Sequence, residues 1–178
     1  MIEAAALNEL SRRVATLEAE GAARRVVMDY FRLCDTLGRD TSLDRLGGMF
    51  TRDAIWEGRG RYREAFGLHE GRAAIVAMLA RYADPPHFAL NGHYLSSETI
   101  AVHDDTHVTG QWMMLQVSTY QDGRSDFRSA ALTIDLTIED GAWRIAHFVT
   151  EAVFSRDVAP WNDDAAISVP PIAAGEGA

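Results

Sequence analysis

The sequence predicts an α+β fold in which helices pack on one face of a cone-shaped, curved antiparallel sheet and enclose a pocket. Helical periodicity dominates the first part of the chain, and alternating strand patterns fill most of residues 87–154. Helices followed by a run of strands are typical of α+β domains. The 178 residues, 47% hydrophobic and 24% charged, suit one domain of ordinary composition.

The first helix is predicted from an apolar stripe whose members are spaced three, four and three residues apart: Leu7, Leu10, Val14 and Leu17. Gly21 is expected to interrupt this helix, and a second one follows over residues 22–37. We therefore predict a helical extension at 1–21, the α+β domain at 22–156 and a tail at 157–178. The tail is expected to wrap a surface or to be partly disordered.

Two further helices are predicted before the strands begin. Ser42 can cap a short helix in "SLDRLGGMF", because its hydroxyl can accept a hydrogen bond from the first turn. The segment "RAAIVAMLARYA" predicts a helix that ends before Pro85 and Pro86, since the residue before a proline avoids helical geometry.

Strands are predicted at "DAIWEG", at 87–103, and in "VTGQWMMLQVSTY", "SAALTIDLTI" and "WRIAHFVTEAVF", with acidic or glycine-containing turns between the later ones. Alternation places one set of side chains on a single face of the third segment: Trp112, Met114, Gln116, Ser118 and Tyr120. The corresponding set on the last strand is Trp143, Ile145, His147 and Val149. The "EDGA" sequence predicts a tight hairpin turn.

Charge and composition exclude several classes of function. The net charge is −9 and the isoelectric point is about 5.0, which argues against binding to nucleic acid or to anionic membranes. The single Cys34 excludes an intrachain disulfide. The first twenty residues lack a continuous apolar region, so neither a signal peptide nor a membrane span is expected there. We expect a soluble cytoplasmic protein.

Two histidines raise the question of a metal site. His87 and His93 share a strand face with Asn91, but six strand residues separate the two imidazoles by about 20 Å. Ligands of one metal ion lie about 2 Å from it, so the two histidines cannot share an ion. His103 and His107 flank an acidic turn and could chelate only weakly. We therefore predict no metal and no cofactor, and the sequence contains no P-loop or dinucleotide fingerprint.

Four segments together resemble the nuclear-transport-factor-2-like superfamily and, within it, the SnoaL-like branch. They are "YFRLCDTLGRDTSLDRLGGMFTRDAIWEG", "GRAAIVAMLARY", "HYLSSETIAVHDDTHVTGQW" and "DGAWRIAHF". Scytalone dehydratase and bile acid 7α-dehydratase are enzymatic members of this superfamily. The resemblance spans roughly residues 22–154 and implies the cone-shaped α+β fold, but the fold hosts many unrelated activities.

The resemblance implies three catalytic candidates, because Tyr30, Asp35 and His93 fall on the pocket tyrosine, aspartate and strand histidine of the dehydratases. Two positions depart from the family pattern: Ser97 replaces an asparagine, and the arginine near the end of the last strand is replaced around His147. Each candidate also has a structural interpretation, as a core tyrosine, an exposed helix-end aspartate and a hydrogen-bonded sheet histidine. Tyr30 and Asp35 are also about 140° apart around an ideal helix.

A second set of residues is predicted to bind the substrate. Four side chains can form the walls of a pocket for a flat hydrophobic molecule, or can equally be core: Trp56, Trp112, Met114 and Tyr120. His87 and Asn91 are candidates for the rim or for orienting the substrate. His147 lies between apolar residues, where a histidine is more often a core residue than a catalyst.

These observations predict a cofactor-independent lyase that acts on a small hydrophobic, aromatic or polycyclic hydroxylated substrate. A dehydration or a retro-aldol release of an aldehyde would use the same His–Asp pair and tyrosine. An isomerase of the same fold is an alternative, as is a non-catalytic module like the small subunit of aromatic-ring dioxygenases. We also expect a homo-oligomer; the resemblance implies a trimer, with a dimer as the second possibility.

Overall fold

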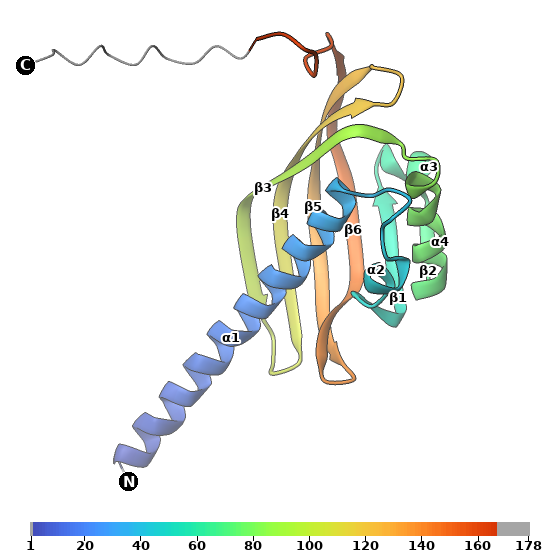
Figure 1. Cartoon of the computed structure of the whole chain (residues 1–178). Helices are drawn as coiled ribbons and strands as arrows, with labels where there is room; N and C mark the ends of the chain where they lie inside the picture. Colours follow the sequence, from blue (N-terminus) through green and yellow to red (C-terminus); the bar gives the residue numbers. More distant parts are fainter. Residues whose placement is uncertain (1, 167–178) are drawn as a thin grey trace, which may run out of the picture.

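The computed structural model describes residues 2–166, and these form an α+β domain in which helices cover one face of a six-stranded sheet (Figure 1). The part of the tail at 167–178 lies outside the described residues. The elements follow in the order α1 (Ile2–Asp35), α2 (Leu43–Gly47), β1 (Phe50–Arg59), α3 (Tyr62–Phe66), β2 (Leu68–Glu70), α4 (Arg72–Ala83), β3 (Phe88–Val102), β4 (His107–Tyr120), β5 (Ser125–Glu139) and β6 (Ala142–Val158).

The sheet is curved and unclosed, and its strand order is β2-β1-β6-β5-β4-β3. The predicted α+β class with helices on a curved sheet is confirmed. One pairing departs from the predicted antiparallel pattern, because β1 and β6 run parallel. The C-terminal half of α1 lies across the sheet, whereas its N-terminal half projects beyond it (Figure 1). The buried residues of α1 accordingly fall between Ala19 and Phe31.

The predicted interruption at Gly21 is wrong, because α1 is one continuous helix. A glycine inside a helix costs only about 1 kcal/mol relative to alanine, and the residues around Gly21 are mostly strong helix formers. Within α1 the apolar residues divide into two groups. Ala23, Val27 and Phe31 are buried against the sheet, whereas the predicted stripe that begins at Leu7 is exposed.

The other predicted helices and strands are present, with two additions. Ser42 caps α2 by accepting a hydrogen bond from the amide of Arg45 at 3.2 Å. Asp140 and Gly141 both have positive φ, as the tight hairpin turn between β5 and β6 requires. The short elements α3 and β2 were not predicted, because five and three residues carry too little periodicity to identify them.

A β-bulge changes which side chains of β6 face the helices. Leu136 pairs with Ile145 but Asp135 pairs with His147, so Ala146 is an extra residue in β6. Beyond the bulge the alternation is shifted by one residue, and Phe148 rather than His147 faces the core. The predicted face of Trp143, Ile145, His147 and Val149 is therefore wrong after Ile145.

In the part of the chain that the structure describes, no helix has the length and hydropathy needed to span a membrane.

Candidate active site

A pocket of about 380 Å³ lies between the sheet and the C-terminal half of α1, with α3 and α4 at its sides. Much of its wall is aromatic, formed by Tyr30, Phe31, Trp56, Tyr62, Phe66 and Phe148. The Trp56 and Phe148 rings are stacked, with centroids 5.4 Å apart and planes inclined by 4°. Such walls suit a flat, largely apolar ligand, and the polar groups that enter the pocket are few.

His93 of β3 and Asp35 at the end of α1 meet beside this pocket. Nδ1 of His93 lies 2.5 Å from Oδ1 of Asp35, and the same oxygen accepts a hydrogen bond from the His93 backbone amide at 3.1 Å. A carboxylate can only accept a hydrogen bond, so Nδ1 carries a proton, and in the neutral imidazole Nε2 is then the free acceptor. The His93 side chain is 10% exposed and its ring packs on Phe31 with centroids 4.8 Å apart. Its imidazole is therefore fixed in both tautomer and orientation.

Asp35 has a structural reason to be at an otherwise unfavourable position. The C-terminal end of a helix carries partial negative charge, so a carboxylate there is disfavoured. The two hydrogen bonds that His93 donates to Asp35 offset this unfavourable interaction with the helix dipole. They also attach the C-terminal end of α1 to β3. Tyr30 and Asp35 need not point in the same direction, although both belong to the site. Tyr30 lines the pocket, whereas Asp35 lies outside the lining and contacts the His93 imidazole there.

Tyr30 is buried in the pocket wall, with 3% of its surface exposed. The indole Nε1 of Trp56 donates a hydrogen bond to its hydroxyl oxygen at 3.3 Å, so the Tyr30 proton points elsewhere. Burial raises the pKa of Tyr30 well above its usual value, which keeps the phenol protonated. Near neutral pH Tyr30 is therefore a neutral phenol, which can donate a hydrogen bond but cannot act as a base.

Of the residues predicted to bind substrate, Trp56, His87, Asn91 and Met114 line the pocket. The carbonyl of Asn91 is already occupied, because Oδ1 accepts hydrogen bonds from Gln116 Nε2 and Ser118 Oγ, both at 2.8 Å. Asn91 therefore fixes the orientation of Gln116, which was not predicted as a site residue and also lines the pocket.

Trp112, Tyr120 and His147 do not line the pocket, so the structure does not bring them together with the other predicted residues. Trp112 is buried and its indole donates to Glu98 at 3.1 Å. The hydroxyl of Tyr120 donates to Asp126 at 2.9 Å. The bulge in β6 turns His147 to the other face, where Nε2 lies 2.9 Å from a carboxylate oxygen of Glu57.

Arg128 of β5 lines the pocket and was missed in the sequence. Its position was visible in principle, because Arg128 is in phase along β5 with Ala130 and Leu132, which are buried in the core. In the sequence, an arginine that follows a row of alternating apolar residues indicates that the strand has left the core at that position. Only the pairing across the sheet shows that the face continues into a pocket.

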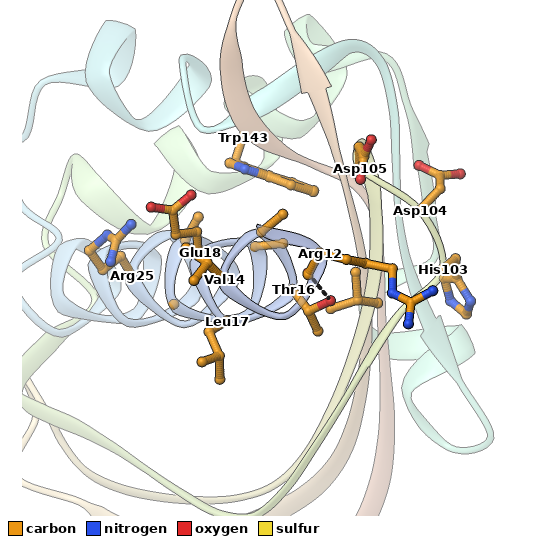
Figure 2. Close-up of a pocket in the computed structure, with 15 residues that line it drawn as sticks. Arg12, Val14, Thr16, Leu17, Glu18, Arg25, His103, Asp104, Asp105 and Trp143 are labelled. Atoms are coloured by element: carbon orange, nitrogen blue, oxygen red, sulfur yellow. Dashed lines mark hydrogen bonds between the residues drawn. The ribbon is translucent and has the colours of Figure 1, made fainter. Parts of the chain in front are cut away.

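A second hollow, an open groove of about 1050 Å³, lies between α1 and the turn before β4 (Figure 2). Figure 2 shows Asp104, Asp105 and Trp143 around the helix that carries Glu18 and Arg25. The nearby histidines have local partners: His107 contacts Asp104 at 3.0 Å and His103 contacts Thr109 at 2.8 Å. Within residues 2–166 no three His, Cys, Asp or Glu side chains are grouped to hold a metal. The His107–Asp104 pair at the groove is exposed, whereas the His93 side chain at the inner pocket is only 10% exposed, so the inner pocket is the candidate site.

The protonated groups around the pocket predict that alkali destabilises the fold. Burial raises the pKa of Cys34 from 9.0 to about 12, and it raises that of Tyr30 well above 10.0. Above about pH 9 the unfolded chain therefore binds fewer protons than the folded chain, so the free energy of unfolding falls as the pH rises. We expect Tm to decrease between about pH 8 and about pH 10.5, and less steeply in Cys34→Ser and Tyr30→Phe. The exposed Tyr94→Phe is the control, and an unchanged slope in both pocket variants would contradict this prediction.

Comparisons with known proteins identify the family and the fold. The sequence profile of the SnoaL-like domain matches residues 15–149. A comparison with curated proteins finds no match. A protein from Novosphingobium aromaticivorans, provisionally assigned as a scytalone dehydratase, superimposes with a TM-score of 0.70 and 17% identity over 88% of this chain and 99% of that one. The hexachlorocyclohexane dehydrochlorinase LinA-type3 from Novosphingobium barchaimii gives 0.69 and 19%, over 89% and 99%. At such identities the likeness shows the fold alone.

Proposed function

Because the chain belongs to the SnoaL-like family, we propose that the pocket is the active site of a cofactor-independent lyase. The observation that carries this proposal is the 2.5 Å contact between His93 and Asp35 at the edge of an aromatic pocket. A histidine held in one tautomer by a carboxylate is a general base near neutral pH. The proposed substrate is small, hydrophobic and hydroxylated, with an aromatic or polycyclic skeleton that matches the walls.

In a dehydration, Nε2 of His93 takes a proton from a carbon of the substrate. The resulting electron pair forms a double bond as the hydroxyl on the neighbouring carbon leaves, and the imidazolium returns a proton to it, so that water is released. Asp35 positions His93 and stabilises its charged form. Tyr30 donates a hydrogen bond to an oxygen on which negative charge grows.

A retro-aldol cleavage would use the same groups in another order. His93 would take the proton of a hydroxyl, the adjacent carbon–carbon bond would break to release an aldehyde, and the imidazolium would protonate the carbon left behind. An isomerase would likewise need a base that returns its proton to a different carbon. The names of the two structural relatives, a dehydratase and a dehydrochlorinase, both denote eliminations and favour the first reaction.

The accessible pocket beside His93 supports an enzyme over a non-catalytic module. A direct test is to incubate the protein with a panel of aromatic and polycyclic β-hydroxy compounds and to follow new conjugated double bonds by ultraviolet absorption. Substrates deuterated at the carbon that loses its proton should react more slowly if that step limits the rate. If no member of the panel reacts and none binds, the proposed lyase activity is rejected.

We further propose a cytoplasmic homo-oligomer, with a trimer favoured over a dimer. Leu7, Leu10, Val14 and Leu17 form an exposed apolar stripe in the N-terminal half of α1. Their three-four-three spacing is that of a coiled-coil seam, which a second copy of the helix can cover.

Light scattering should therefore give a multiple of 19.6 kDa, and the double variant Leu10→Glu, Leu17→Glu should give a smaller particle. Leu68→Glu, which changes an exposed leucine of β2, is the matched control. A wild-type mass of 19.6 kDa would reject both the trimer and the dimer.

A further inference from the structure

Three pocket residues form one row across the sheet. His93 of β3 pairs with Gln116 of β4, and Gln116 pairs with Arg128 of β5, so the three side chains project from the same face. Neighbouring strands are about 4.8 Å apart, which places the Cα atoms of His93 and Arg128 about 10 Å from each other. Any ligand that lies flat along this row beside His93 therefore also reaches Arg128.

Asp126 and Tyr120 hold one edge of the Arg128 guanidinium in place. Its Nε and one terminal nitrogen contact Oδ2 of Asp126 at 2.7 and 2.6 Å, and the same terminal nitrogen donates to the hydroxyl of Tyr120. Asp126 is buried, with 2% exposed. The Arg128 side chain is 24% exposed and borders the pocket. A guanidinium held in this way is preorganised to present its remaining edge to a ligand.

The remaining edge of Arg128 has unused donors. No residue within 2–166 accepts a hydrogen bond from Nη1 of Arg128. Among the described residues that line the pocket, Arg128 is the only one with a permanent charge, and no carboxylate lines it. Nη1 is not buried, so this edge is open to a ligand, and a planar carboxylate pairs with a guanidinium edge in matching geometry.

We propose that Arg128 binds a carboxylate of the substrate, so that the ligand of this pocket is an aromatic hydroxy acid rather than a neutral hydroxylated compound. The carboxylate lies on Arg128, the ring lies between the aromatic walls, and the reacting carbon faces His93. Gln116, whose Nε2 is committed to Asn91, offers its carbonyl to a hydroxyl between the two ends. The inference rests on the proposed function for the role of His93, but the carboxylate subsite itself requires only the geometry around Arg128.

The test compares two probes of similar shape, 2-naphthoate and 2-naphthalenemethanol, by isothermal titration calorimetry on the full chain. The wild type should bind the carboxylate about tenfold or more tightly than the alcohol, because a charge-assisted hydrogen bond replaces a neutral one. In Arg128→Met the preference should vanish while the alcohol binds as before. The double variant Arg128→Met, Asp126→Asn removes both charges, so it separates loss of binding from loss of folding caused by a buried unpaired carboxylate.

Arg156→Met removes an exposed arginine from β6 and should keep the wild-type preference. His93→Ala should also keep it, because the base does not touch the carboxylate. If Arg128 only supports the fold, the preference will persist in the folded double variant, and the proposal is then overturned. Equal binding of the two probes to the wild type, or no binding of 2-naphthoate, overturns it as well. A retained preference in His93→Ala together with undiminished turnover would reject the proposed mechanism and leave the subsite standing.

Discussion

His93→Ala is expected to lower kcat/KM on the identified substrate by about 10²–10⁴-fold, the usual contribution of a positioned general base. Asp35→Asn should lower it by a comparable factor, because an amide can leave the imidazole in the wrong tautomer. The carboxylate of Asp35 also accepts a hydrogen bond from the backbone amide of His93, so the substitution disturbs β3 as well as the imidazole ring. Steady-state kinetics on both variants, with circular dichroism to verify folding, measures these effects.

The matched control for His93 is His107→Ala, because His107 is an exposed histidine at the start of β4 whose side chain contacts Asp104 and Thr106. It should keep the wild-type rate. Adding imidazole to the medium should restore part of the activity of His93→Ala, since the vacated site borders the pocket. Full turnover in both His93→Ala and Asp35→Asn would exclude the proposed mechanism.

Gly58→Ala is expected to destabilise the protein by about 1–3 kcal/mol, the usual cost of inserting a methyl group into packed structure. A Cβ at this position would overlap the carbonyl oxygen of Tyr62 and lie 2.8 Å from its carbonyl carbon. These are backbone atoms, so no side-chain rotation relieves the overlap. The first residue of α3 would have to move, and with it the pocket wall formed by Tyr62 and Phe66.

Thermal unfolding measures this effect, at roughly 2–4 °C of Tm for each kcal/mol in a chain of this size. Gly38→Ala is the control, because the nearest atom to its added Cβ is 3.9 Å away. Gly58→Ala should also weaken binding of 2-naphthalenemethanol, since the displaced helix carries two aromatic walls. A Tm equal to that of Gly38→Ala would mean that α3 adjusts without cost.

Local signals predicted the elements wherever they were long and regular. The helix α4 begins and ends at the predicted residues, because an apolar periodicity, a preceding glycine and a following proline pair all agree. The face of β6 could not be predicted beyond Ile145, since a bulge depends on the register with β5 and not on β6 alone. The prediction at Gly21 failed because the helix-propensity cost of one glycine is small compared with the stabilisation from packing of the helical residues that follow it.

The site was predictable to the extent that its residues resemble family positions. Tyr30, Asp35 and His93 were named from such positions, but their meeting depends on how far the sheet curves around α1. The pairing of β3 with β4 and of β4 with β5 brings Arg128 into the row of His93, and no pattern within one strand reveals it. Trp112 and Tyr120 have the correct alternation for the pocket face, but they lie beyond its lining.

The parallel pairing of β1 with β6 has a consequence for biosynthesis. Phe50 pairs with Ile145, so the strand that leaves the ribosome first among the six acquires its main neighbour only when the last strand has emerged. Until then β1 can pair only with the three residues of β2. Contacts between such distant parts of a chain form slowly, because a long loop must close first. The edge of β1 is therefore exposed on the nascent chain, where a chaperone would find an unpaired strand until β6 has left the ribosome.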